Sequence, residues 1–263
     1  MSLVLDRYLH RQSLIHQLDP RIKLIVTVAF IVSNVLLPDG AWLAFLAAWG
    51  LTLLVSQQAK LGVWFALRRS FIALPFMLAG FSVIFATPGQ IIGRWQLLWL
   101  ELTVTDMGII RLISLMWRSW LSVQMAILLT ATTTFPDLTH ALRHLKVPSV
   151  LVSIISFMYR YLFILVEEAQ RLLRARAARS AALPGKKAGG SLIWRAKVAG
   201  GMIGQLFIRS LDRADRVYLA MAARGYRGQL LTMNAHTLSK QDWLIASLAF
   251  ALLLLIQLIG RIV

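Results

Sequence analysis

The sequence predicts an all-α polytopic membrane protein with about five transmembrane helices and two further long helices on the cytoplasmic side. Of its 263 residues, 58% are hydrophobic and only 15% are charged, which is too apolar for an ordinary soluble domain. Six apolar runs recur, each about long enough to cross a hydrocarbon core of roughly 30 Å. These runs lie at 22–37, 41–56, 71–87, 110–131, 149–166 and 243–260.

The charge is strongly positive and unevenly distributed. Residues 135–240 hold 17 of the 28 lysines and arginines against five acidic residues, a net charge of +12. In a soluble protein this would suggest a nucleic-acid partner, but in a membrane protein it indicates the cytoplasmic side. The chain has no cysteine, which excludes thiolate metal sites and disulfides. The first residues, "MSLVLDRYLHRQ", show no cleavable signal pattern.

The first four runs are interpreted as transmembrane helices. "PDG" at 38–40 predicts a tight turn between the first two, and Pro75 predicts a tolerable kink in the third. The loop at 57–69 carries three basic residues and no acidic one, whereas the loop at 88–108 carries one arginine against two acidic residues. The positive-inside rule therefore places the N-terminus and 57–69 in the cytoplasm and 88–108 outside.

The fifth run must be treated differently. If 149–166 crossed the membrane completely, the arginine-rich segment 171–227 would lie outside, which the positive-inside rule disfavours. We therefore expect 149–166 to dip into the bundle or lie obliquely against it. One helix is predicted from 149 to about 182, roughly 50 Å long. "LPGKKAGG" at 183–190 predicts a turn, and a second long helix runs from 192 to about 225.

These assignments divide the chain into three regions: N-terminal transmembrane helices at 1–134, a cytoplasmic region at 135–240, and a C-terminal transmembrane helix at 241–263. The last helix should leave the C-terminus outside. Ala196, Gly200 and Gly204 recur every four residues on the second long helix, so they share one face. We expect the two long helices to cross or pack there, although incidental small residues are common in apolar helices.

Known catalytic and metal-binding patterns are incomplete. "SAALPGKK" at 180–187 lacks both the first glycine and the final hydroxyl of a phosphate loop. Two carboxylates in "DRADR" at 212–216 could hold a divalent ion, but the adjacent arginines favour a solvated salt-bridge face. His140 and His144 have metal-ligand spacing without an evident third ligand. We therefore predict neither a catalytic residue nor a bound metal.

The arginines of "RLLRARAARS" at 171–180 allow two interpretations. They could be an ordinary membrane flank that contacts lipid phosphates. However, Ala178-Arg179-Ser180 has a counterpart in Ala223-Arg224-Gly225, and each places one arginine between small residues at a predicted helix end. Small neighbours would let a helix tip enter a groove on a partner, where a guanidinium can bind an acidic group. Arg171, Arg174 and Arg176 remain assigned to the flank.

Three stretches together resemble the transmembrane T component of energy-coupling factor transporters, especially the cobalt-type CbiQ-like members. "HQLDPRIKL" at 16–24, with Asp19, Pro20 and Arg21, resembles the N-terminal signature of that family. Residues 132–180 resemble its central region. The two Ala-Arg-small elements match its paired coupling motifs, with Ser180 in place of the commoner glycine.

The resemblance implies a non-catalytic scaffold in the bacterial cytoplasmic (inner) membrane. Its partners would be two ATP-binding cassette ATPases, a substrate-binding membrane subunit of the CbiM type and a possible small accessory membrane subunit. ATP and Mg²⁺ would bind to the ATPases, and this chain would bind no cofactor or nucleic acid. Arg179 and Arg224 would each enter a groove of one ATPase.

Several alternatives remain open. Within the family, cobalt or nickel uptake is favoured, and a vitamin-specific or shared module is the runner-up. An ordinary ABC permease would need further spanning helices after the cytoplasmic contact region, and only 243–260 follows it. A membrane-embedded enzyme would need convergent carboxylates or histidines at membrane depth, for which the spans offer few candidates.

Overall fold

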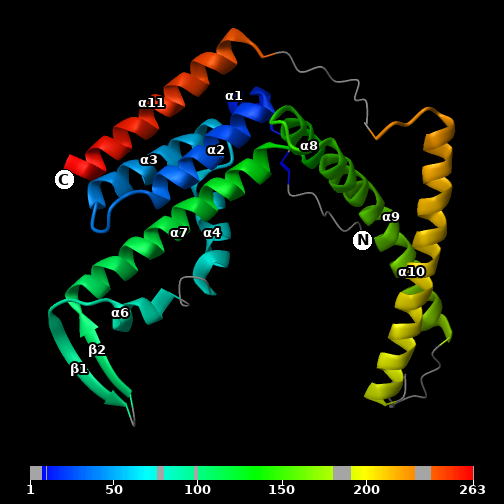
Figure 1. Ribbon diagram of the computed structural model, residues 1–263, viewed down its shortest axis with the longest axis horizontal. Helices are drawn as coiled ribbons and strands as arrows, with labels where there is room; N and C mark the ends of the chain where they lie inside the picture. The colour runs from blue at the N-terminus through cyan, green and yellow to red at the C-terminus, as the bar shows by residue number, and fades with distance from the viewer. Residues whose placement is uncertain are drawn as a thin grey trace. The chain divides into compact units, whose positions relative to one another are not determined.

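The computed structural model describes residues 8–9, 11–75, 80–97, 100–179, 191–228 and 238–262. The chain divides into two compact units, which are described separately. Unit 1 comprises Met1–Leu145 and Ala235–Val263, and unit 2 comprises Lys146–Asn234. The helical fold class is confirmed, with one small β-hairpin added to it (Figure 1).

Unit 1 is a helical bundle with the hairpin attached. Its elements are α1 (Leu14–Gln17), α2 (Pro20–Val35), α3 (Trp42–Gln58), α4 (Val63–Ser70), the 3₁₀ turns η1 (Phe71–Ala73) and η2 (Gly80–Ser82), α6 (Val83–Ala86), β1 (Ile91–Leu97), β2 (Leu100–Thr105), α7 (Asp106–Thr132), α8 (Phe135–His144) and α11 (Lys240–Ile262).

The long helix α7 is the centre of unit 1. It contacts α2, α3, α4 and α6, while α11 packs on α2 and α3. Phe30, Phe45, Leu121 and Leu128 from α2, α3 and α7 are at most 1% exposed and form the middle of the core. Because lipid tails are as apolar as these side chains, close van der Waals packing between the helices, and not transfer out of water, stabilises this junction.

The predicted turn at 38–40 is present between α2 and α3. Gly40 has φ +85°, a left-handed conformation that glycine adopts without strain. Its N–H donates to Ser114 Oγ at 3.0 Å, and Arg118 Nη2 donates to Asp39 Oδ1 at 2.7 Å. The turn is therefore fixed onto α7 by two residues that lie far from it in the sequence.

Residues 71–75 and 80–86 of the predicted span are helical, with η1, η2 and α6 among them. Residues 76–79 lie outside the described part of the chain, so the continuity of this span stays a prediction. Two glycines explain the close packing of these pieces on α7. A Cβ on Gly80 would lie 2.6 Å from Leu115 Cδ2, and one on Gly108 would lie 2.6 Å from the Ile84 carbonyl oxygen.

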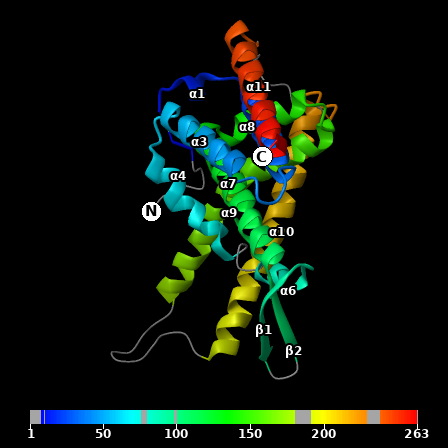
Figure 2. The same cartoon turned by 90° about the vertical axis from the view of Figure 1, so that its left-hand side faces the viewer.

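The segment at 88–108, predicted to be a loop, contains the hairpin. β1 and β2 pair in antiparallel register, with Arg94 opposite Thr103 and Leu97 opposite Leu100 (Figure 2). Thr105 joins the hairpin to α7, because its Oγ1 accepts the Gly108 N–H at 3.1 Å and donates to the Thr87 carbonyl at 2.8 Å. This is a side-chain N-cap, which satisfies a free donor at the start of α7.

Unit 2 consists of two long helices, as predicted. α9 spans Ser149–Arg179 and α10 spans Leu192–Ala223. Ser191 caps α10, since its Oγ accepts the Trp194 N–H at 3.3 Å. The two helices contact each other through Arg209 of α10, whose Nη1 lies 2.5 Å from Glu168 Oε1 of α9.

Among the described helices, three are long and apolar enough to cross a membrane: Asp106–Thr132, Ser149–Arg179 and Lys240–Ile262. α3 is apolar but has 17 residues, and α2 has 16. The length of α9 would allow it to cross the membrane. The oblique position expected for 149–166 therefore depends on the charge of the segment that follows, and it stays a prediction.

Candidate functional site on the two long helices

The tip of α10 is shaped by the Ala223-Arg224-Gly225 element. The Gly225 N–H donates to the Ala222 carbonyl and the Tyr226 N–H donates to the Met221 carbonyl, both at 3.0 Å. This pair of bonds is a Schellman motif, which ends a helix at a residue in the left-handed conformation. Gly225 has φ +80°, so the glycine is required by the backbone. Arg224 is left exposed as the last residue before the chain turns.

The tip of α9 carries the other element. Arg179 is the last helical residue, and both Ala178 and Arg179 are exposed. Ser180 lies outside the described residues. Cations are favoured at helix C-termini, which carry a partial negative charge, and both arginines occupy such ends. Within the part of the chain that the structure describes, neither guanidinium forms an ion pair.

The other arginines on α9 differ in their contacts. Arg171 Nη1 lies 3.7 Å from Glu168 Oε2, so it forms an ion pair with its own helix. Arg176 is half-buried and also has a partner, whereas Arg174 is exposed. The cluster at 171–180 is therefore not uniform: Arg171 and Arg176 are engaged within the protein, and Arg179 points its charge outward at the helix end.

The small residues of α10 do not contact α9 in the way that the sequence suggested. Ala196, Gly200 and Gly204 are exposed, and no atom lies within 4 Å of where a Cβ would stand on Gly200 or Gly204. The two helices meet instead near Glu168 and Arg209. In the described residues, α9 and α10 therefore do not pack closely at these small residues. The face of α10 that carries them is exposed.

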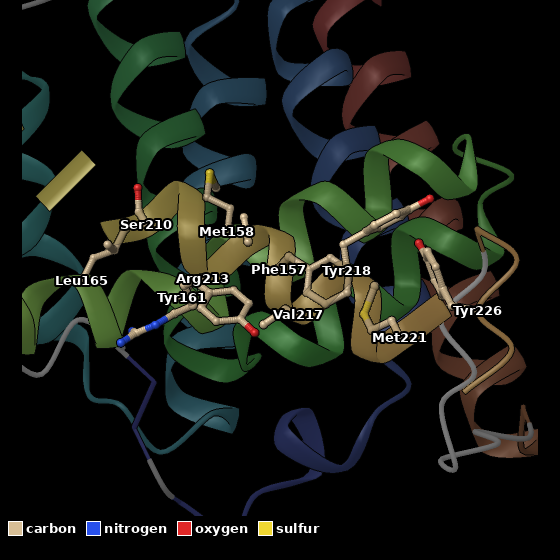
Figure 3. Close-up of a pocket in the computed structure, with 11 residues that line it drawn as sticks. Phe157, Met158, Tyr161, Leu165, Ser210, Arg213, Val217, Tyr218, Met221 and Tyr226 are labelled. Carbon is tan, nitrogen blue, oxygen red and sulfur yellow. The ribbon is translucent and has the colours of Figure 1, made fainter. Parts of the chain in front are cut away.

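An apolar groove lies between α9 and α10, which the sequence analysis did not predict (Figure 3). Its volume is about 470 Å³. Figure 3 shows Leu165, Ser210 and Arg213 at one end and Met221 and Tyr226 at the other. It is lined by Phe157, Met158, Tyr161, Leu165, Ser210, Arg213, Ala214, Val217, Tyr218, Met221 and Tyr226.

The groove is connected to the tip of α10 through the helix cap. Met221 and Tyr226 line one end of the groove. They are also the two residues joined by the Schellman hydrogen bond that spans more of the chain, from the Tyr226 N–H to the Met221 carbonyl. A contact between these two positions commonly accompanies the motif. The cap that exposes Arg224 therefore also closes one end of the groove.

The N-terminal signature lies in unit 1 and organises the start of α2. Asp19 is the N-cap, and its Oδ1 accepts the Arg21 N–H at 2.9 Å. Pro20 is the first helical residue, where its missing N–H has no cost. Arg21 Nε lies 3.7 Å from Asp19 Oδ1.

Two further charged residues join this signature. Lys23 Nζ donates to the carbonyls of His16 at 3.0 Å and Thr132 at 3.2 Å, and Asp242 Oδ1 accepts the Asp19 N–H at 3.2 Å. Asp19, Lys23 and Asp242 are all buried, and we call them the signature clasp. Neither Lys23 nor Asp242 was identified from the sequence, because Thr132 lies 109 residues from Lys23 and Asp19 lies 223 residues from Asp242.

The candidate metal ligands do not converge. Asp212 and Asp215 are exposed on α10, in unit 2, whereas the rings of His140 and His144 stack edge to face in unit 1 with centroids 4.7 Å apart. Among the residues that the structure describes, no group of three or more histidine, cysteine, aspartate or glutamate side chains could hold a metal ion.

Comparison with known proteins agrees with this architecture. Residues 11–234 match the CbiQ family, described as cobalt transport protein. The chain is 30% identical to the energy-coupling factor transporter transmembrane protein EcfT of Brevibacillus brevis, over 97% of each chain. It is also 30% identical to the EcfT of Clostridium kluyveri, over 99% of this chain and 97% of the relative. The EcfT of Lactobacillus helveticus is 26% identical, over 96% and 91%. The chain therefore belongs to the CbiQ family and is a transmembrane T component of the energy-coupling factor transporters.

Proposed function

We propose that this chain couples two ATP-binding cassette ATPases to a substrate-binding membrane subunit. In this proposal, Arg179 and Arg224 each enter a groove of one ATPase and bind an acidic or carbonyl group there. ATP and Mg²⁺ bind to the ATPases, whose closing and opening moves the two helix tips. The observation that carries the proposal is the pair of exposed arginines at the ends of two helices of 31 and 32 residues. Stiff helices of this length transmit displacement, which coupling requires.

The substrate-binding subunit would dock on the apolar surface of the long helices. Three features support this: the groove of about 470 Å³, the exposed apolar start of α9, and the open face at Ala196, Gly200 and Gly204. Small residues allow a partner helix to approach the backbone closely within a membrane. Tilting of α9 against α10 would then move the docked subunit.

The transported substrate is proposed to be Co²⁺ or Ni²⁺, bound by a partner subunit of the CbiM type with a small accessory subunit. The description of the CbiQ family as cobalt transport protein supports this. The second candidate is a shared module that serves vitamin-specific subunits, which the EcfT names of the relatives favour. In both cases the substrate binds to the partner.

Charge reversal at the two tips tests the proposal. Arg179→Glu together with Arg224→Glu should reduce ATPase copurification and Co²⁺ uptake by reconstituted complexes at least about tenfold, because a like charge in a buried contact costs several kcal/mol. Arg174→Glu and Arg216→Glu are the matched controls, since both side chains are exposed on the same helices outside the motifs. Equal losses in the controls, or unchanged copurification in the tip variant, would contradict the proposal. Wild-type complexes that take up a vitamin and not Co²⁺ would favour the second candidate.

A further inference from the structure

The two chain connections between the units lead away from elements near the signature clasp: the first follows α8, which comes directly after α7, and the second leads into α11. α7 ends at Thr132, and the chain continues through α8 to the start of unit 2 at Lys146. It returns to unit 1 at Ala235 and enters α11 at Lys240. Any force that the long helices exert on unit 1 along the backbone must pass through these two connections, at Lys146 and at Ala235.

Lys23 holds the end of α7, which α8 separates from the first connection. Its ammonium group donates to the Thr132 carbonyl at the C-terminal end of α7 and to the His16 carbonyl. The last carbonyls of a helix lack partners within the helix and carry a partial negative charge, so a buried ammonium satisfies them and stabilises that end. Lys23 is only 8% exposed, which keeps water from competing for these bonds.

Asp242 holds the second connection. Its Oδ2 accepts the Ser239 N–H at 2.9 Å, and Ser239 Oγ accepts the Asp242 N–H at 3.2 Å. This reciprocal pair has the arrangement of a capping box at the start of α11. The other carboxylate oxygen accepts the Asp19 N–H, so the cap of α11 and the cap of α2 share one side chain.

The position of α11 in the bundle does not depend on these contacts alone. Leu253 and Ile256 are buried in the core, and a Cβ on Gly260 would lie 2.7 Å from Leu37 Cδ2. Gln257 Nε2 also donates to Ser33 Oγ at 2.9 Å. The clasp therefore adds something that packing does not supply: it fixes the end of α11 at which the chain arrives from unit 2.

We propose that Lys23 and Asp242 are positioning residues that hold the end of α7 and the start of α11 on the first turn of α2, so that movement of the long helices is not absorbed by unit 1. The inference rests on the coupling function proposed above. Without the clasp, the C-terminal end of α7 and the N-terminal end of α11 would shift when the ATPases move the helix tips. ATP would then be hydrolysed with little transport.

The test separates coupling from assembly. Lys23→Met and Asp242→Asn keep side-chain size and remove the charge. In reconstituted complexes, Co²⁺ transported per ATP hydrolysed should fall at least about tenfold, because each variant leaves buried backbone groups without the charged side chain that now satisfies them. Copurification of the ATPases and the substrate-binding subunit should stay within about twofold, since the tip arginines are intact. Gln257→Leu is the matched control: it breaks a bond between α11 and α2 away from the connections and should leave the ratio unchanged.

A distance measurement covers the case in which Lys23→Met does not fold. The chain has no native cysteine, so Leu145→Cys and Lys240→Cys introduce the only two sites for spin labels, both exposed in unit 1. In the otherwise native chain the label distance should be the same with and without ATP. In the milder Asp242→Asn variant it should change or broaden between the two states.

An unchanged ratio of transport to hydrolysis in Asp242→Asn would overturn the inference. So would a parallel loss of hydrolysis, assembly and transport, which would show that the clasp only stabilises the fold. Failure of the coupling proposal has a different signature, because the Arg179 and Arg224 variants would then keep both copurification and uptake.

Discussion

Arg224 and Gly225 show how a single residue can determine the direction of its neighbour. Gly225 adopts φ +80° and ends α10, and the chain then turns so that Tyr226 reaches the groove beside Met221. Arg224 is thereby left at the outermost point of the helix. At the tip of α10, the backbone conformation therefore requires the small residue after the arginine. This adds to the steric reason that the sequence suggested for both tips.

Gly225→Ala should destabilise the tip of α10 by about 1 kcal/mol and reduce ATPase copurification, because a Cβ is strained in the left-handed conformation. Gly225→Asn should retain more binding than Gly225→Ala, since asparagine tolerates this conformation. The control is Gly201→Ala, which lies inside α10 with nothing within 4 Å of the added Cβ. Quantitative pull-down of the ATPases measures all three. Equal binding by Gly225→Ala and wild type would show that the cap does not position Arg224.

At the scale of elements, local patterns predicted the long helices well. α9 and α10 were predicted at 149–182 and 192–225 and are found at Ser149–Arg179 and Leu192–Ala223. Pro148 and Gly225 mark two of their four ends, and these signals depend only on neighbouring residues. The turn at 38–40 was predicted for the same reason.

Elements decided by distant contacts were not predicted. The packing of η2 and α6 against α7 depends on Gly80 and Gly108, and the groove depends on where α9 and α10 cross. The clasp joins residues more than 100 positions apart. A single sequence shows none of these pairings, because apolar periodicity reports which face is buried and not what covers it.

The contact between α6 and α7 gives a test at this scale. Gly108→Ala would place a methyl group 2.6 Å from the Ile84 carbonyl oxygen, so the backbone must shift. Such overpacking costs about 1–3 kcal/mol, and the thermal midpoint of the purified protein should fall. Gly50→Ala in α3 has nothing within 4 Å and should leave the midpoint unchanged or raise it. A midpoint that is equal in both variants would show that this packing is not tight.

At the scale of the whole molecule, the proposed coupling assigns different roles to the two units. Unit 2 carries the exposed tips, the groove and the open face of α10. Unit 1 carries the apolar core around α7 and the clasp, which contacts the end of α7 and the start of α11. This proposed division gives a role to the two long, largely exposed helices of unit 2.

Cross-linking from the helix tips tests the central claim most directly. The chain has no cysteine, so Ala178→Cys and Ala223→Cys each place a single thiol beside a tip arginine without removing it. Ile203→Cys, exposed in the middle of α10, is the control. In membranes that contain the complete transporter, a short thiol-to-amine cross-linker should join each tip cysteine to an ATPase and should not join the control. Tip cysteines that react no more with the ATPases than Ile203→Cys does would contradict the account.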